Sequence, residues 1–95
     1  MTGRRIDVEP HIFEPGDYGR WLDIWWCRAP VIDGLLGNLG GHRVEEHEDG
    51  TITVSPSILL GSQGRTWHGF LERGIWMEWI DHESTKAKTG RRKDW

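Results

Sequence analysis

Turn-forming residues recur along this chain and divide it into short segments that are rich in strand-forming side chains. Three sequences carry the signal: Pro15-Gly16-Asp17, Asp49-Gly50 and Glu72-Arg73-Gly74. Proline presets φ at the start of a turn, and glycine accepts the positive φ that tight hairpins require. No helical pattern alternates with the strands, as it would in a parallel α/β sheet. The chain is therefore predicted to be mainly β and to be built from antiparallel hairpins.

The N-terminal half carries two segments that predict strands. Residues 6–12 alternate apolar and polar side chains, and Pro10 within the run bends the strand or restricts it to a sheet edge. Residues 21–27 (WLDIWWC) place bulky side chains on both faces, which predicts a central strand covered on each side. Residues 28–41 instead space apolar residues three and four apart, interrupted by glycines. This pattern predicts a single irregular helical turn or a structured loop.

The C-terminal half predicts two hairpins. Asp49-Gly50 suits a type I′ turn that leads into a returning strand with alternating side chains. Pro56 cannot donate a hydrogen bond to a ladder, so that strand should end or bulge there. Residues 61–64 (GSQG) have the composition of a flexible loop, and a second hairpin follows it. We expect residues 1–80 to form one small antiparallel sheet or sandwich, with at most one short helical segment. Residues 81–95 should form a polar, flexible tail.

Composition excludes several classes of protein. The 95 residues suffice for one core only. The net charge of −3 argues against a general nucleic-acid binder, because such proteins carry a basic surplus. The single cysteine excludes an internal disulfide, and no apolar run is long enough to span a membrane. A cytoplasmic protein is the resulting expectation.

Four side chains are candidate metal ligands: Cys27, His42, His47 and His68. Zinc takes three or four such ligands in tetrahedral geometry. His42 and His47 have the spacing of a zinc-binding pair, but on a strand an odd separation places them on opposite faces. Cys27 with His68 would also satisfy the logic of a cysteine nucleophile with a histidine base. A lone cysteine in an aromatic strand is more typical of a small buried hydrophobe, so we expect neither a cofactor nor catalysis, with a zinc site or a Cys/His enzyme as the alternatives.

Six of the seven tryptophans lie outside the predicted tail, and they are more than so small a core can easily hide: Trp21, Trp25, Trp26, Trp67, Trp76 and Trp79. Some indoles should therefore lie at a surface, where neighbouring arginines would suit a base, nucleotide or peptide ligand. Packing of the same rings under the hairpins is the alternative. The predicted ligand-binding residues are Trp25, Trp67, His68, Trp76, Arg65 and Arg73. Gly69, after the Trp67-His68 pair, predicts a close backbone approach or a bulge.

Three stretches carry a resemblance to a known group of proteins: EPGDYGRWL, GNLGGHRVEEHEDGTITVSPSILL and WHGFLERGIW. They are similar to small uncharacterised proteins of actinobacteriophages, which in turn resemble a wider bacterial and phage family of unknown function. The resemblance covers residues 8 to 80, and Pro56-Ser57-Ile58 together with His68 in a hairpin is its most specific part.

The resemblance implies no activity. Members of the wider family often carry several cysteines, which would make a metal site. Here only Cys27 and His68 match such ligands, and Trp67 stands where a cysteine or serine is expected. His42 or His47 would have to complete a zinc site.

These observations predict a small phage-encoded accessory protein that acts in the host cytoplasm by binding a host protein or a small nucleotide-like ligand. A metal-dependent or Cys/His enzyme is one alternative. A structural or self-associating protein, including a homo-oligomer, is the other.

Overall fold

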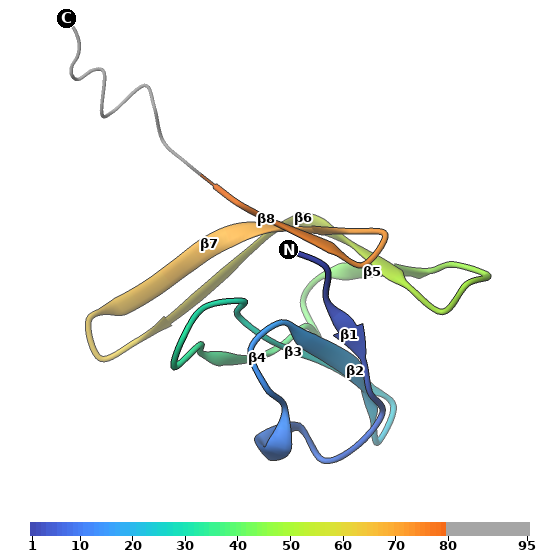
Figure 1. The fold of residues 1–95 in the computed structure, drawn as a ribbon, viewed down its shortest axis with the longest axis horizontal. Helices are drawn as coiled ribbons and strands as arrows, with labels where there is room; N and C mark the ends of the chain where they lie inside the picture. The colour runs from blue at the N-terminus through green and yellow to red at the C-terminus, as the bar shows by residue number, and fades with distance from the viewer. Residues whose placement is uncertain (80–95) are drawn as a thin grey trace, which may run out of the picture.

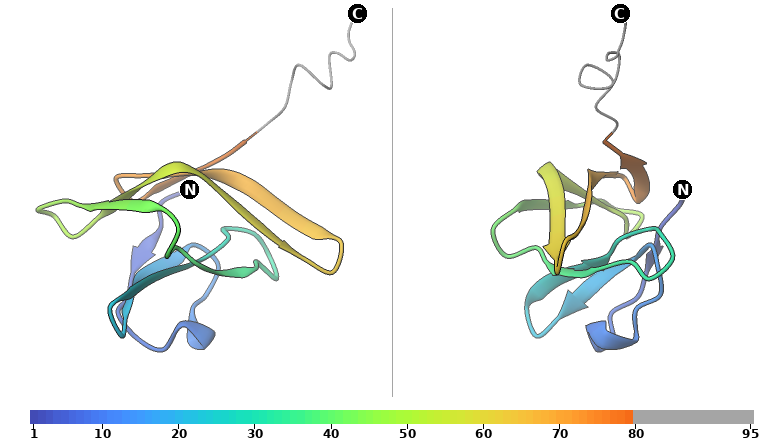
Figure 2. Two further views of the ribbon diagram at one scale, coloured as in Figure 1. Left: turned by 180° about the vertical axis from the view of Figure 1, so that it is seen from behind. Right: turned by 90° about the vertical axis from the view of Figure 1, so that its left-hand side faces the viewer.

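The computed structural model describes residues 1–79 and shows two four-stranded sheets packed on one another (Figures 1 and 2). The first sheet comprises, in spatial order, β1 (Arg4–Arg5), β2 (Asp17–Trp21), β3 (Ile24–Arg28) and β4 (Leu36–Asn38). The second comprises β5 (Arg43–Glu46), β6 (Ile52–Ser62), β7 (Arg65–Glu72) and β8 (Ile75–Glu78). The prediction of a mainly β, hairpin-built protein is confirmed. The predicted tail at residues 81–95 lies outside the described residues.

The predicted central strand at residues 21–27 is wrong, because the chain turns in the middle of this segment. Trp21 pairs with Ile24, so only Leu22 and Asp23 connect β2 to β3. Both residues have positive φ, 53° and 63°, as in a type I′ turn. Leucine carries no turn signal, which is why the sequence pattern extends through the turn.

Two further predictions need correction. Residues 6–12 do not form a strand, because the only N-terminal strand is β1 and Pro10–Ile12 form a short 3-10 helix, η1. Proline fits the first position of a helical turn, and the N–H of Phe13 donates to the carbonyl of Pro10 at 2.9 Å. Residues 28–41 contain no helical turn. Residues 29–35 form a structured loop, the other predicted outcome, and β4 follows it. Ile32 on the predicted apolar face is exposed.

The two predicted C-terminal hairpins are present. Glu46 pairs with Ile52, so the first hairpin has a longer loop than a two-residue type I′ turn, with positive φ at Gly50 and not at Asp49. The Asp49 carboxylate accepts hydrogen bonds from the side chain and backbone of Thr51, which lower its pKa. The predicted flexible loop at residues 61–64 is shorter than expected, because β6 and β7 are joined by Gln63 and Gly64 alone.

Strand β6 bulges at Pro56, which is one of the two predicted outcomes, and does not end there. Val54 pairs with Leu71 and Ile58 with Gly69, so four steps along β6 correspond to two steps along β7. Residues 55–57 therefore lie opposite Phe70 alone, two residues more than a regular ladder contains. The even number keeps the buried side chains of β6 on the inner face on both sides of the bulge.

The core lies between the two sheets. Its buried members from the first sheet and the loops beside it are Tyr18, Cys27, Ala29 and Leu39. Its members from the second sheet are Ile52, Val54, Ile58, Leu60, Trp67, Leu71 and Trp76. Each strand of the second sheet thus sends alternate residues inward and the others to an outer face that no element among residues 1–79 covers.

The N-terminal segment connects the two sheets at their edges. Thr2 pairs with Ile75 beside β8, and the N–H of Gly3 donates to the carbonyl of Gly74 at 2.7 Å. The chain then enters β1, which runs parallel to β2 in the other sheet. From β1, the Arg5 guanidinium reaches the Glu46 carboxylate of the second sheet at 2.6 Å.

Candidate binding groove

The predicted tryptophan surface does not exist as one surface. Trp67 and Trp76 are only 5% and 3% exposed, and their rings meet edge to face in the core with centroids 5.4 Å apart. The indole N–H of Trp76 donates to the carbonyl of Gly16 at 2.9 Å. Trp25 is half-buried in the first sheet, where the Arg5 guanidinium lies 4.9 Å from its ring centroid. The alternative prediction, that the tryptophan rings pack in the core under the hairpins, is therefore correct for Trp67 and Trp76.

The predicted arginines lie at opposite ends of β7. Arg65 begins the strand, and its guanidinium donates to the backbone carbonyl of Asp33. Arg73 lies in the turn after the strand, where its N–H donates to the hydroxyl of Thr53 at 3.0 Å. Since β7 is eight residues long, the two cations cannot serve one small ligand.

His68 follows Trp67 on the strand and therefore faces the opposite side, the outer face of the second sheet. Its Nε2 forms a 2.7 Å hydrogen bond with the hydroxyl of Ser57. Its ring stacks on Trp79, with centroids 5.1 Å apart and an interplanar angle of 20°. The Pro56-Ser57-Ile58 segment and the hairpin histidine are thus in direct contact.

The predicted metal ligands and catalytic residues are not grouped. Cys27 is fully buried, and this burial raises the pKa of its thiol to about 12. His42 donates from Nε2 to the carbonyl of Ser57 at 3.0 Å, and Nε2 of His47 bonds the hydroxyl of Thr53 at 2.7 Å. Within residues 1–79, no hydrogen bond joins Cys27 to His68, and no three His, Cys, Asp or Glu side chains are placed to hold one metal ion.

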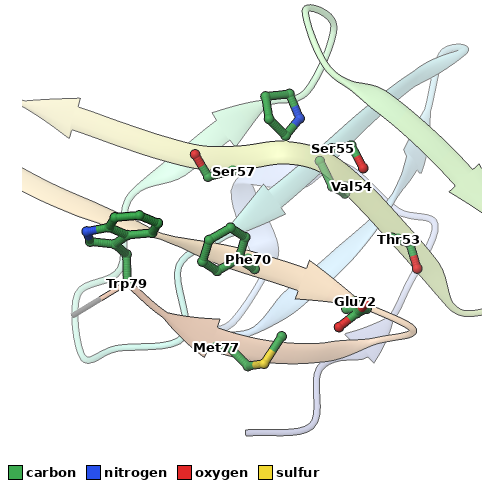
Figure 3. Close-up of a pocket in the computed structure, with 9 residues that line it drawn as sticks. Thr53, Val54, Ser55, Ser57, Phe70, Glu72, Met77 and Trp79 are labelled. Carbon is green, nitrogen blue, oxygen red and sulfur yellow. The ribbon is translucent and has the colours of Figure 1, made fainter. Parts of the chain in front are cut away.

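The bulge in β6 opens a groove on the outer face of the second sheet (Figure 3). Its volume is about 450 Å³. The residues that line it come from β6, β7, β8 and the end of the described chain: Thr53, Val54, Ser55, Pro56, Ser57, Phe70, Glu72, Met77 and Trp79. The three bulged residues, which lie opposite Phe70 alone, form one side of the groove.

The walls of the groove combine apolar and hydroxyl groups. Phe70, Met77 and Trp79 provide aromatic and thioether surface, and Phe70 and Trp79 lie with ring centroids 5.7 Å apart. Ser55 and Ser57 line the groove from β6. His68 does not line the groove but packs on Trp79, which does, so it is placed to position that ring.

Gly69 is needed for the close packing of the strands beside the groove. A Cβ at this position would lie 2.4 Å from the carbonyl oxygen of Met77 and 2.3 Å from the Trp67 ring. The prediction of a close backbone approach at Gly69 is confirmed.

The sequence interpretation missed Phe70 and Met77. The signal that could have found them is the bulge at Pro56 combined with the strand alternation of residues 67–77, which directs both side chains outward. Trp67 and Trp76 were predicted to bind a ligand because tryptophan is common at binding surfaces, but both indoles point into the core.

Comparison of the chain with protein-family models, with curated proteins and with solved structures found no significant match. Among residues 1–79, no helix is long and apolar enough to cross a membrane.

Proposed function

We propose that this chain is a small phage-encoded accessory protein that acts in the host cytoplasm by binding, and that the groove at the β6 bulge is its ligand site. The phage origin rests on the sequence resemblance. The binding role rests on one observation, the groove lined by Phe70, Met77 and Trp79 on an otherwise regular sheet face.

The dimensions and chemistry of the groove favour a small planar ligand. A volume of about 450 Å³ lies within the range of small-molecule sites, roughly 300–1,000 Å³. Aromatic walls bind flat rings by stacking, and the serine hydroxyls offer hydrogen bonds that would orient such a ring. Because none of the lining residues is lysine or arginine, a ring without phosphate suits the groove better than the nucleotide of the initial hypothesis.

A second candidate, self-association, is favoured by the exposed apolar side chains of the same face. Leu59 is 64% exposed and Trp79 47% exposed, and Ile75 and Met77 are also exposed. A second copy of the chain could cover them. Sedimentation velocity over a wide concentration range tests this: a concentration-dependent shift towards a dimer supports self-association, and an invariant monomer contradicts it.

The ligand proposal is tested by NMR titration of the ¹⁵N-labelled protein with indole as a neutral planar probe. We expect the amide signals of Phe70, Met77 and Ser55 to shift. Trp79→Ala should weaken the apparent affinity about tenfold, because stacking of one ring contributes roughly 1–3 kcal/mol. Leu59→Ala removes an exposed apolar side chain from the same face, outside the groove, and should leave the affinity unchanged.

Absence of shifts in the groove at millimolar indole would overturn the small-ligand proposal. Equal weakening by Trp79→Ala and Leu59→Ala would also contradict it, since the probe would then bind the apolar face in general.

A further inference from the structure

The charge of the groove restricts the ligands that it can hold. Glu72 is the only lining residue with a charged side chain, and the other eight are apolar or carry a hydroxyl group. Arg73, its neighbour in sequence, lines a separate hollow together with acidic residues of β5 and the following turn. Within residues 1–79, Glu72 forms no ion pair. Among the described residues, the groove therefore presents one carboxylate without an ion-pair partner.

Glu72 lies on the same strand as Phe70, which belongs to the aromatic wall. Phe70 and Glu72 are two positions apart on β7, so they face the same side and are separated by about 6.6 Å along the strand. Phe70 lies between Trp79 at one end of the groove and Glu72 at the other (Figure 3). A ligand ring stacked on Phe70 and Trp79 could therefore reach the Glu72 carboxylate through a short substituent.

We propose that the groove selects a planar aromatic ring that carries a protonated amine on a short arm. The ring lies on Phe70 and Trp79, and the ammonium group lies against Glu72. Both ends favour a positive charge, because aromatic faces attract cations and a carboxylate attracts them more strongly. This inference rests on the proposed function and adds the charge and shape of the ligand.

Three probes with the same ring and different charge test the inference. Tryptamine is cationic, indole is neutral and indole-3-acetate is anionic at neutral pH. In isothermal titration calorimetry at low salt, we expect tryptamine to bind about tenfold more tightly than indole-3-acetate, with indole between them. The advantage of tryptamine should decrease as salt is added, because the charged end of the groove is open to solvent.

Glu72→Gln is the decisive variant, since it removes the charge and keeps the size of the side chain. It should remove most of the advantage of tryptamine over indole, because only the attraction of the aromatic faces for the cation then remains. Glu78→Gln is the matched control, because Glu78 is an exposed carboxylate of β8 that does not line the groove. It should leave the order of the three probes intact.

The outcomes separate this inference from the function on which it rests. If none of the three probes binds, the proposed binding function itself is overturned. If indole binds but tryptamine has no advantage, or if Glu72→Gln leaves that advantage in place, only the selection of a cationic amine is overturned.

Discussion

Cys27 illustrates how the environment of one residue decides its chemistry. Its side chain is inaccessible between the sheets, and no cation or helix N-terminus among the described residues acts on it, so desolvation alone determines its pKa. A thiol in this state is neither a nucleophile nor a metal ligand at neutral pH, because both roles need the thiolate. The Cys/His enzyme hypothesis therefore has no support in this geometry.

We expect the Cys27 thiol to react with iodoacetamide only when the protein is unfolded. Mass spectrometry after labelling at pH 8, with and without urea, measures this directly. Cys27→Ser should lower the free energy of unfolding by about 1–3 kcal/mol, because a hydroxyl replaces an apolar group in the core. Cys27→Ala should cost less, and rapid labelling of the native protein would contradict the buried position.

The raised pKa of the Cys27 thiol predicts that the folded protein loses stability at alkaline pH. The ordinary pKa of the thiol is 9.0, and the folded value is about 12. Above pH 9 the unfolded chain releases this proton while the folded chain keeps it, so stability decreases between pH 9 and about pH 12. The free energy of unfolding of Cys27→Ala, measured over the same pH range, should lack this component.

The hairpin between β2 and β3 has a turn residue that is poorly suited to its backbone conformation and can be replaced. Leu22 is exposed and has positive φ, a conformation that costs a side chain with Cβ roughly 1–2 kcal/mol. The pair Leu22→Asn and Asp23→Gly should raise the free energy of unfolding by about 1 kcal/mol, since Asn-Gly is favoured in type I′ turns. The exposed Arg20–Asp23 ion pair that is lost contributes little.

Urea unfolding followed by circular dichroism measures this gain. Gln63→Asn is the control, because the turn between β6 and β7 already has glycine at its second position and should gain only a few tenths of a kcal/mol. A double variant less stable than the parent would show that the turn is not strained.

The bulge in β6 can be removed without changing which side chains face the core. Deletion of Ser55 and Pro56 would place Ser57 directly opposite Phe70 and restore a regular ladder. We expect this variant to keep its circular dichroism spectrum and to lose indole binding by at least about tenfold, since the groove depends on the extra residues. Binding that survives in the folded variant would show that the bulge does not form the site.

Some features of these strands and turns could be predicted from the sequence, and others could not. Hairpins with glycine in the turn and a bulge at Pro56 were predictable, because each depends on a local property of one or two residues. The turn at Leu22-Asp23 was not, since leucine has no turn preference and aspartate alone is too weak a signal within an apolar run. The groove was missed for a different reason: Phe70 acquires its role only from the register of β6 against β7.

For the whole molecule, the two sheets should unfold together. They share one core, and the N-terminal segment and Arg5 connect their edges. In urea, the transitions seen by far-ultraviolet circular dichroism and by tryptophan fluorescence should coincide, as expected for a small two-state domain. Separate midpoints would show that each sheet is stable alone.

The two extra residues of β6 have an evolutionary consequence. A one-residue insertion in a strand turns every following side chain to the other face, whereas a two-residue insertion leaves the rest of the pattern unchanged. A gene that encodes a plain sheet can therefore gain such a groove, or lose it, through a single in-frame change of two codons that leaves the core untouched. Related chains can differ in the presence of the site while sharing the fold, and the spacing between the residues at positions 54 and 58 is the place to look for the difference.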